Sequence, residues 1–140
     1  MLFRSNHISA FWDFLPTVCE LIGVDAPDES DGISYLPALL NKSQEEHRFL
    51  YWEYFHYNYN WNPSSGLSRN HLDSQAVRLG DWKGVRYNMK NDLTTPVELF
   101  NLSVDTAESN DVSSQHPEIV KEILNIMQVE HNDKEFFKIQ

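Results

Sequence analysis

The chain of 140 residues is poor in cysteine and glycine and has no long hydrophobic run. A single cysteine, Cys19, forms neither an internal disulfide nor a cysteine-based zinc site by itself. The five glycines do not form a phosphate-binding loop, and no apolar run approaches the roughly 18 to 20 residues that span a bilayer. The first residues lack the basic and then apolar order of a signal peptide, so the compartment stays undetermined.

Positive charge is also scarce. Eleven Lys and Arg stand against 21 Asp and Glu, which gives a formal net charge of -10. Such a chain repels nucleic-acid backbones and anionic membrane surfaces, which argues against both as partners. The aromatic content of 13% is too high for a disordered chain of this charge, so a folded core is expected.

Two short helices are predicted near the N-terminus. Apolar residues recur at helical spacing between Asp13, the expected N-cap, and Gly23, the expected C-terminal stop. A second segment, from Ser34 to Asn41, repeats this design, with Pro three residues after a capping side chain. The stretch 25–32 between them is rich in Asp, Pro and Gly and is expected to be a loop.

Strands and a last helix are predicted in the remainder of the chain. The Gly80-Asp81 pair is typical of a tight hairpin turn. An amphipathic helix opens at His116-Pro117-Glu118, with Pro in the first position. The fold class is therefore α+β, a four-stranded antiparallel sheet packed by a C-terminal helix and preceded by two short helices. The expected strands are 48–55, 75–79, 82–87 and 97–102.

The sequence shows no catalytic nucleophile and no metal site. No two of the six histidines stand at the i, i+4 spacing that puts two ligands on one helix face. Cys19 is expected to be an inert buried thiol, because it falls in the middle of a predicted helix. Asp105 and Glu108 resemble part of a calcium loop, but without further acids at regular spacing they fit turn-capping residues better.

Three basic residues of the predicted hairpin could hold an anion. Isolated basic residues on a strand are more often solvated or paired with nearby acids, and we favour that interpretation here. The residues are Arg78, Lys83 and Arg86.

The stretch 56–72 opens with aromatic residues that alternate with amides, as in Tyr57-Asn58-Tyr59-Asn60-Trp61. Aromatic faces stack on the C–H faces of sugars while amides bind hydroxyls, so this stretch fits a glycan-binding surface. An ordered loop whose aromatics pack on the protein itself fits equally well. Glu53 and His56, at the end of the preceding strand, would face either a cleft or solvent.

Several short blocks follow one another in an order that is characteristic of one enzyme family. They include Phe11-Trp12-Asp13-Phe14-Leu15-Pro16-Thr17, Asp31-Gly32-Ile33-Ser34-Tyr35-Leu36-Pro37, Tyr51-Trp52-Glu53-Tyr54, Arg78-Leu79-Gly80-Asp81-Trp82-Lys83, Glu98-Leu99-Phe100-Asn101-Leu102 and His116-Pro117-Glu118. Together these blocks resemble the C-terminal third of a formylglycine-dependent sulfatase of the arylsulfatase family, in the alkaline-phosphatase-like superfamily. The first block also resembles phosphatases and phosphodiesterases of that superfamily, whereas the later blocks are closer to sulfatases.

This resemblance implies a division into two parts. Residues 1–45 would be the end of the large sulfatase α/β domain, and residues 46–140 would be the C-terminal subdomain. In the family that subdomain borders the cleft in which a sulfated carbohydrate or aryl sulfate binds. The residues implied to line the substrate pocket are Trp52, Glu53, His56, Tyr57 and Trp61.

The resemblance also implies that this chain is catalytically incomplete. The formylglycine nucleophile of the family arises in a Cys/Ser-x-Pro-Ser/Ala-Arg motif, and Cys19, followed by Glu20-Leu21-Ile22, does not match it. Formylglycine and calcium are therefore expected in a full-length family member and not in this chain, which should be inactive alone. An alternative is a stand-alone glycan-binding module that uses the aromatic stretch 56–66.

The implied partner is the missing N-terminal sulfatase domain. Helices 13–22 and 34–40 would pack against that domain, so here they are expected to be exposed or to form a homodimer. The parent family is often periplasmic or secreted.

Overall fold

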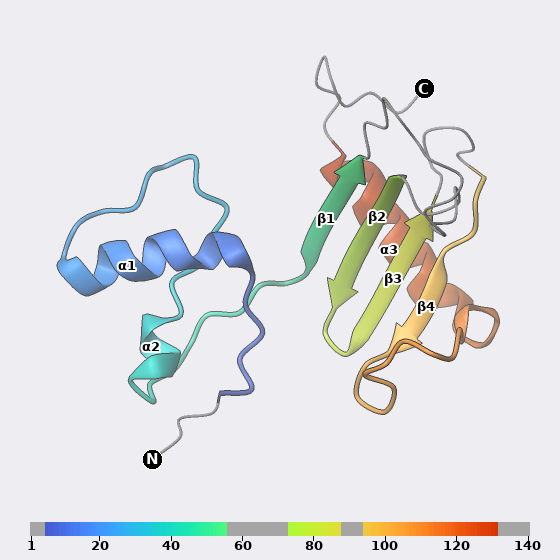
Figure 1. The fold of residues 1–140 in the computed structure, drawn as a ribbon, viewed down its shortest axis with the longest axis horizontal. Helices are drawn as coiled ribbons and strands as arrows, with labels where there is room; N and C mark the ends of the chain where they lie inside the picture. The colour runs from blue at the N-terminus through green and yellow to red at the C-terminus, as the bar shows by residue number, and fades with distance from the viewer. Residues whose placement is uncertain (1–4, 56–72, 88–93, 132–140) are drawn as a thin grey trace, which may run out of the picture. The chain divides into compact units, whose positions relative to one another are not determined.

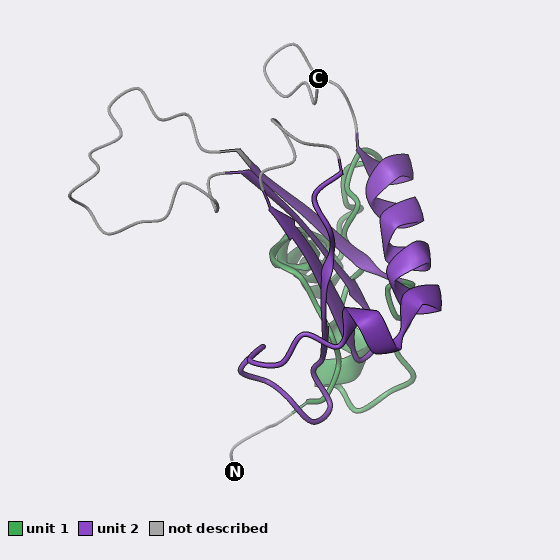
Figure 2. Ribbon diagram, turned by 90° about the vertical axis from the view of Figure 1, so that its right-hand side faces the viewer, with its two compact units in different colours: residues 1–48 green, residues 49–140 purple. Residues whose placement is uncertain are grey.

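The computed structural model describes residues 5–55, 73–87 and 94–131. The chain divides into two compact units, Met1–Arg48 and Phe49–Gln140, which Figure 2 colours green and purple. The first unit contains helices and the second contains a sheet and a helix, in chain order (Figure 1). Among the described residues, no helix is both long and apolar enough to cross a membrane.

The first unit is built from a 3-10 turn and two short helices. Helix η1 (Phe11–Asp13) leads into α1 (Phe14–Ile22), which ends at Gly23 as predicted. Gly23 adopts a left-handed conformation (φ 75°) that glycine takes without steric cost. Helix α2 (Leu36–Leu39) is shorter than the predicted 34–41, and the Ser34 hydroxyl accepts a bond from the Leu36 amide at its start.

The second unit holds a four-stranded sheet with every neighbouring pair antiparallel, which confirms the predicted α+β class. Its strands follow one another in sequence order, as a meander. The two-residue turn at Gly80-Asp81 sets the register of the central hairpin, because it places Leu79 opposite Trp82. The strands are β1 (Leu50–Phe55), β2 (Asp73–Leu79), β3 (Trp82–Tyr87) and β4 (Glu98–Asn101).

Helix α3 (Pro117–Glu130) covers one face of this sheet (Figures 1 and 2). It follows a 3-10 turn, η4 (Ser113–Gln115), and starts at Pro117 as predicted. Gly84 of β3 allows the close approach, since a Cβ atom there would lie 2.7 Å from Ile123 Cγ2. The buried cluster between helix and sheet consists of Val77, Val97, Leu99, Ile123, Ile126 and Met127.

Candidate functional site

The structure describes two of the five residues implied to line the substrate pocket. Trp52 and Glu53 are neighbours in β1, and successive side chains of a strand point to opposite faces of the sheet. Trp52 lies on the face away from α3 and is 37% exposed, whereas Glu53 lies on the face that α3 covers. His56, Tyr57 and Trp61, with the aromatic stretch 56–66, lie outside the described residues.

Glu53 belongs to a row of polar side chains that crosses three strands under α3. Gln75 of β2 pairs in register with Glu53 on one side and with Arg86 of β3 on the other. Gln75 Nε2 donates to Glu53 Oε1 at 2.8 Å, and Arg86 Nη2 donates to Gln75 Oε1 at 2.6 Å. Gln75 is fully buried, so its amide connects the acid and the base away from water.

Two further side chains complete this polar cluster, which we define as Tyr51, Glu53, Gln75, Arg86 and His131. The Tyr51 hydroxyl donates to Glu53 and accepts from Gln75 Nε2 at 2.9 Å. His131, directly after α3, donates from Nδ1 to Glu53 Oε1 at 2.7 Å, because an ionised carboxylate only accepts. The cluster therefore ties the C-terminal end of α3 to β1.

Burial and charge shift two pKa values in the polar cluster. Burial and the adjacent Glu53 carboxylate raise the pKa of Tyr51 well above its ordinary value, so the phenol stays protonated. Burial lowers the pKa of Arg86, although nearby Tyr51 and Glu53 oppose this shift. A protonated phenol and an internally bonded carboxylate do not supply a nucleophile, so we interpret the cluster as a positioning element of the sheet.

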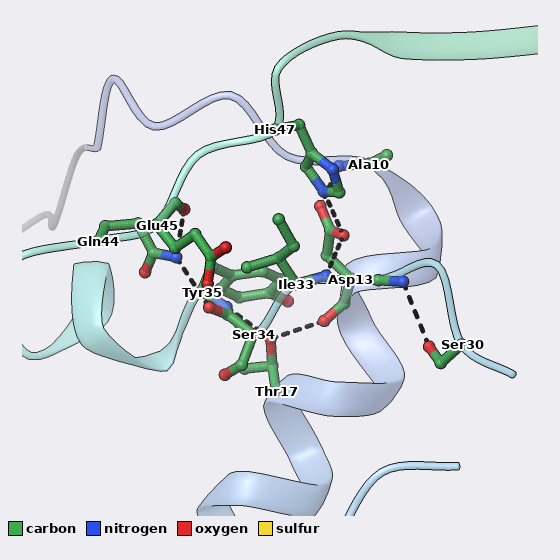
Figure 3. A network of polar contacts seen from close by, with 11 residues as sticks. Ala10, Asp13, Thr17, Ser30, Ile33, Ser34, Tyr35, Gln44, Glu45 and His47 are labelled. Carbon is green, nitrogen blue, oxygen red and sulfur yellow. Dashed lines mark hydrogen bonds and ion pairs between the residues drawn. The ribbon is translucent and has the colours of Figure 1, made fainter. Parts of the chain in front are cut away.

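A second polar network lies within the first unit (Figure 3). The fully buried Asp13 carboxylate accepts from the Ala10 amide at 2.6 Å, from the Ile33 amide at 2.9 Å and from His47 Nε2 at 2.7 Å. Thr17 extends the network, since its hydroxyl donates to the Asp13 carbonyl oxygen and accepts from the Tyr35 amide. Asp13 is the N-cap residue of α1, as predicted, but its carboxylate makes no capping bond to that helix and accepts from the Ala10 amide at the start of η1 instead.

The pKa of Asp13 reflects this network. Burial alone raises it, but the bonds from the Ala10 and Ile33 amides and from His47 outweigh burial, so the net pKa lies below its ordinary value. The network joins α1 to segments 20 and 34 residues further along the chain. We interpret it as the internal support of the first unit.

Three other residues considered in the sequence analysis, Lys83, Asp105 and Glu108, have structural roles. Lys83 pairs with Glu108, with Nζ 2.7 Å from the carboxylate, which confirms the paired interpretation of that base. Asp105 accepts from the Ser109 and Asn110 amides at 2.9 Å, as a turn-capping residue does. Within the described part of the chain, no group of three or more His, Cys, Asp and Glu is placed to hold a metal ion.

Sequence reasoning missed the polar cluster and the Asp13 network. A partial signal for the first was present, because the two-residue turn at Gly80-Asp81 places Gln75 opposite Arg86. The bonds from His131 to Glu53 and from His47 to Asp13 span 78 and 34 residues, and no local pattern encodes them.

Comparisons with known proteins agree with this architecture. The family model described as N-sulphoglucosamine sulphohydrolase, C-terminal, matches residues 4–134. Mouse (Mus musculus) arylsulfatase K is 30% identical over 112 residues, which are 76% of this chain and 18% of the mouse protein. An N-acetylglucosamine-6-O-sulfatase of Bacteroides thetaiotaomicron is 25% identical over 126 residues, which are 89% of this chain and 21% of that protein.

The fold is also that of solved sulfatases. A structure of a 2-O GAG sulfatase superimposes with a TM-score of 0.63 at 24% identity, covering 84% of this chain and 23% of that one. The chain thus spans about a fifth of the length of the curated relatives it matches. On the match over residues 4–134, the chain belongs to the N-sulphoglucosamine sulphohydrolase C-terminal family, which is a sulfatase family.

Proposed function

We propose that this chain forms the C-terminal part of a sulfatase that hydrolyses sulfate esters of a carbohydrate or an aryl alcohol. The observation that carries the proposal is the family match over residues 4–134. The names of the relatives, arylsulfatase K and N-acetylglucosamine-6-O-sulfatase, support sulfate esters as the substrate class and favour a sulfated amino sugar.

The catalytic groups of such an enzyme come from the rest of its polypeptide. Sulfate-ester hydrolysis needs an attacking nucleophile and positive charge near the sulfuryl oxygens. We assign these roles to formylglycine and calcium in the N-terminal sulfatase domain, because this sequence lacks the Cys/Ser-x-Pro-Ser/Ala-Arg motif. The 140-residue chain is therefore inactive by itself.

The first unit supplies a contact surface for that N-terminal domain, as the end of the large α/β domain. Its helices leave large apolar side chains exposed, including Phe14 at 59% and Ile22 at 67%. A hollow of about 610 Å³ beside α1 is lined largely by apolar residues such as Phe11 and Leu15. Exposed apolar surface of this kind supports a partner, and the size of the relatives favours a domain of the same polypeptide over a homodimer.

The second unit supplies a wall of the substrate pocket. Trp52 is exposed on the sheet face opposite α3, and we propose that it contacts substrate together with His56, Tyr57 and Trp61. Glu53 acts through the polar cluster, since its carboxylate is already bonded to Tyr51, Gln75 and His131.

A chimera tests this proposal. The C-terminal fifth of the Bacteroides N-acetylglucosamine-6-O-sulfatase is replaced by this chain, and turnover of N-acetylglucosamine 6-sulfate is compared with that of the same enzyme truncated at the junction. We expect activity in the chimera, none in the truncated enzyme and none in the 140-residue chain with added calcium. Turnover by the purified chain alone, or a folded chimera no more active than the truncated enzyme, would refute the proposal.

A further inference from the structure

The C-terminal end of α3 has one basic side chain in the part of the chain that the structure describes. His131 is the C-cap residue of this 14-residue helix, and the last turn of α3 contains no Lys or Arg. The carbonyl groups at a helix C-terminus form the negative end of the helix dipole, which favours a positive charge placed directly after them. The place of His131 therefore favours the charged imidazolium over the neutral imidazole.

The partner of His131 is an acid of the sheet. His131 Nδ1 lies 2.7 Å from Glu53 Oε1, and the two side chains are only 14% and 17% exposed, so salt and water screen this pair weakly. A neutral imidazole can donate the same bond, but a protonated one adds charge attraction, which makes a hydrogen bond roughly twice as strong. The bond joins residues that are 78 positions apart and connects the end of α3 to β1.

The charged groups that face this pair come from two neighbouring strands. Arg86 of β3 is bonded to Gln75, which is bonded to Glu53, so one positive charge already faces the carboxylate. Asp73 lies on the same face of β2, two residues before Gln75, and is 7% exposed. Its carboxylate has no hydrogen bond or ion pair among the described residues. Two acids thus share one guanidinium, and a protonated His131 balances the second negative charge.

The other titratable side chains near α3 do not replace His131 in this role. Tyr51 stays protonated and donates to Glu53. His116 lies at the opposite end of α3, where its ring packs against Trp82. Histidine is the side chain whose charge ordinarily changes between about pH 5 and 8, so His131 is the group that can change the charge at this end of α3. The charged side chains of α3 itself are exposed, and they are Glu118, Lys121, Glu122 and Glu130.

We propose that His131 is a proton-dependent positioning residue, whose imidazolium holds the C-terminal end of α3 against β1 and so keeps the pocket-lining part of β1 in place. The attraction to Glu53 is complete while the imidazole is protonated and is lost as the pH rises and the ring loses its proton. The inference deepens the proposed function and rests on it only for the effect on substrate, because the contact itself lies within the second unit.

The experiment is an NMR study of the 140-residue chain at a series of pH values between about 5 and 8. The ring signals of His131 report its protonation. Amide exchange, corrected for its intrinsic dependence on pH, reports opening of the last turn of α3 and of β1 at Glu53. We expect the protection of these amides to fall about tenfold as the ring loses its proton, as for loss of a partly buried charge at a helix C-terminus.

Two variants and one control separate the charge from the hydrogen bond. His131→Gln retains a donor that does not titrate, and Glu53→Gln retains an acceptor without the negative charge, so the change in protection with pH should disappear in both. His116→Gln is the matched control, because it removes the histidine at the start of the same helix. The change in protection with pH should persist in that control.

Three results would overturn the proposal. They are a His131 ring whose protonation stays constant over this pH range, protection of the last turn that does not depend on pH in the parent chain, and a dependence on pH that survives in His131→Gln.

The active chimera tests the effect on substrate. Its KM should rise with pH over the same range, and the rise should disappear in His131→Gln at similar kcat. The same rise in both enzymes would refute the positioning role. An inactive chimera bears on the proposed function alone, because the NMR measurements require no turnover.

Discussion

The contact between Gly84 and α3 makes a quantitative prediction about the stability of the second unit. In Gly84→Ala the new Cβ would lie 2.7 Å from Ile123 Cγ2, 3.0 Å from Ile123 Cδ1 and 3.1 Å from Val97 Cγ1. Carbon atoms in contact prefer about 3.5 to 4.0 Å, so α3 has to move outward or the core has to repack. Overpacking of this kind lowers the free energy of unfolding by about 1 to 3 kcal/mol, while replacing a glycine inside a strand raises it by about 0.5 to 1 kcal/mol. We expect the free energy of unfolding to fall by about 1 to 2 kcal/mol in total.

Urea denaturation followed through the NMR signal of the Leu99 amide measures this loss in the second unit alone. With a urea m-value of about 1.5 kcal/mol/M, the midpoint should fall by about 1 M at unchanged m. Ile123→Ala provides the matched test, because it removes both clashing methyl groups. Ile123→Ala alone should lower the free energy of unfolding by about 2 to 5 kcal/mol. The double variant should lose less stability than the sum of the two single variants. A Gly84→Ala chain as stable as the parent, or strict additivity, would refute the packing argument.

Three further substitutions probe the polar networks and the first unit. Asp13→Asn should destabilise the first unit by about 2 to 3 kcal/mol, measured as faster amide exchange there, because it removes charge-assisted bonds. The folded pKa of Asp13 is lowered, so its contribution is complete above the unfolded value near 3.8 and is lost as the pH falls through the folded pKa. The stability of the first unit should therefore depend less on pH below about 4 in Asp13→Asn than in the parent chain. An unchanged dependence of stability on pH would contradict this. Glu53→Gln should lower the free energy of unfolding by roughly 1 to 3 kcal/mol, because it removes the carboxylate near the half-buried Arg86. Thermal unfolding measures this loss, and an unchanged unfolding midpoint would argue against the cluster. Gly32→Ala would place a Cβ against the Trp12 carbonyl oxygen, so we expect the first unit to unfold. Amide exchange measures this, and an unchanged exchange pattern in the first unit would exclude that contact.

The local sequence was sufficient to predict most of the helices and strands. The Gly80-Asp81 turn, the Pro117 start and the Gly23 stop depend on the backbone preferences of single residues, and all three are found where predicted. The exact first and last residues of the helices and strands were predicted less accurately. Helix α2 is shorter than predicted, because helix ends fray, and β2 begins two residues earlier, where Asp73 pairs with Phe55 of β1.

The surroundings of the candidate site residues were less predictable. The family resemblance implied Trp52 and Glu53 together as pocket-lining residues, and the pleat of β1 sends their side chains to opposite faces of the sheet. Asp13 is the N-cap residue of α1, as expected, but the bonds that its carboxylate accepts from Ile33 and His47 come from distant segments. Neither outcome can be read without knowing which chain segments meet.

The sequence by itself determined the α+β class, the hairpin, the two N-terminal helices and the family, because each depends on local preference or on ordered motifs. Only the tertiary structure decided which side chains share a face. The strand register collects Glu53, Gln75 and Arg86 under α3 and leaves Trp52, Tyr54 and Arg78 on the other face. The physical reason is the two-residue period of a strand, which fixes the face of every side chain only when the pairing of the strands is known.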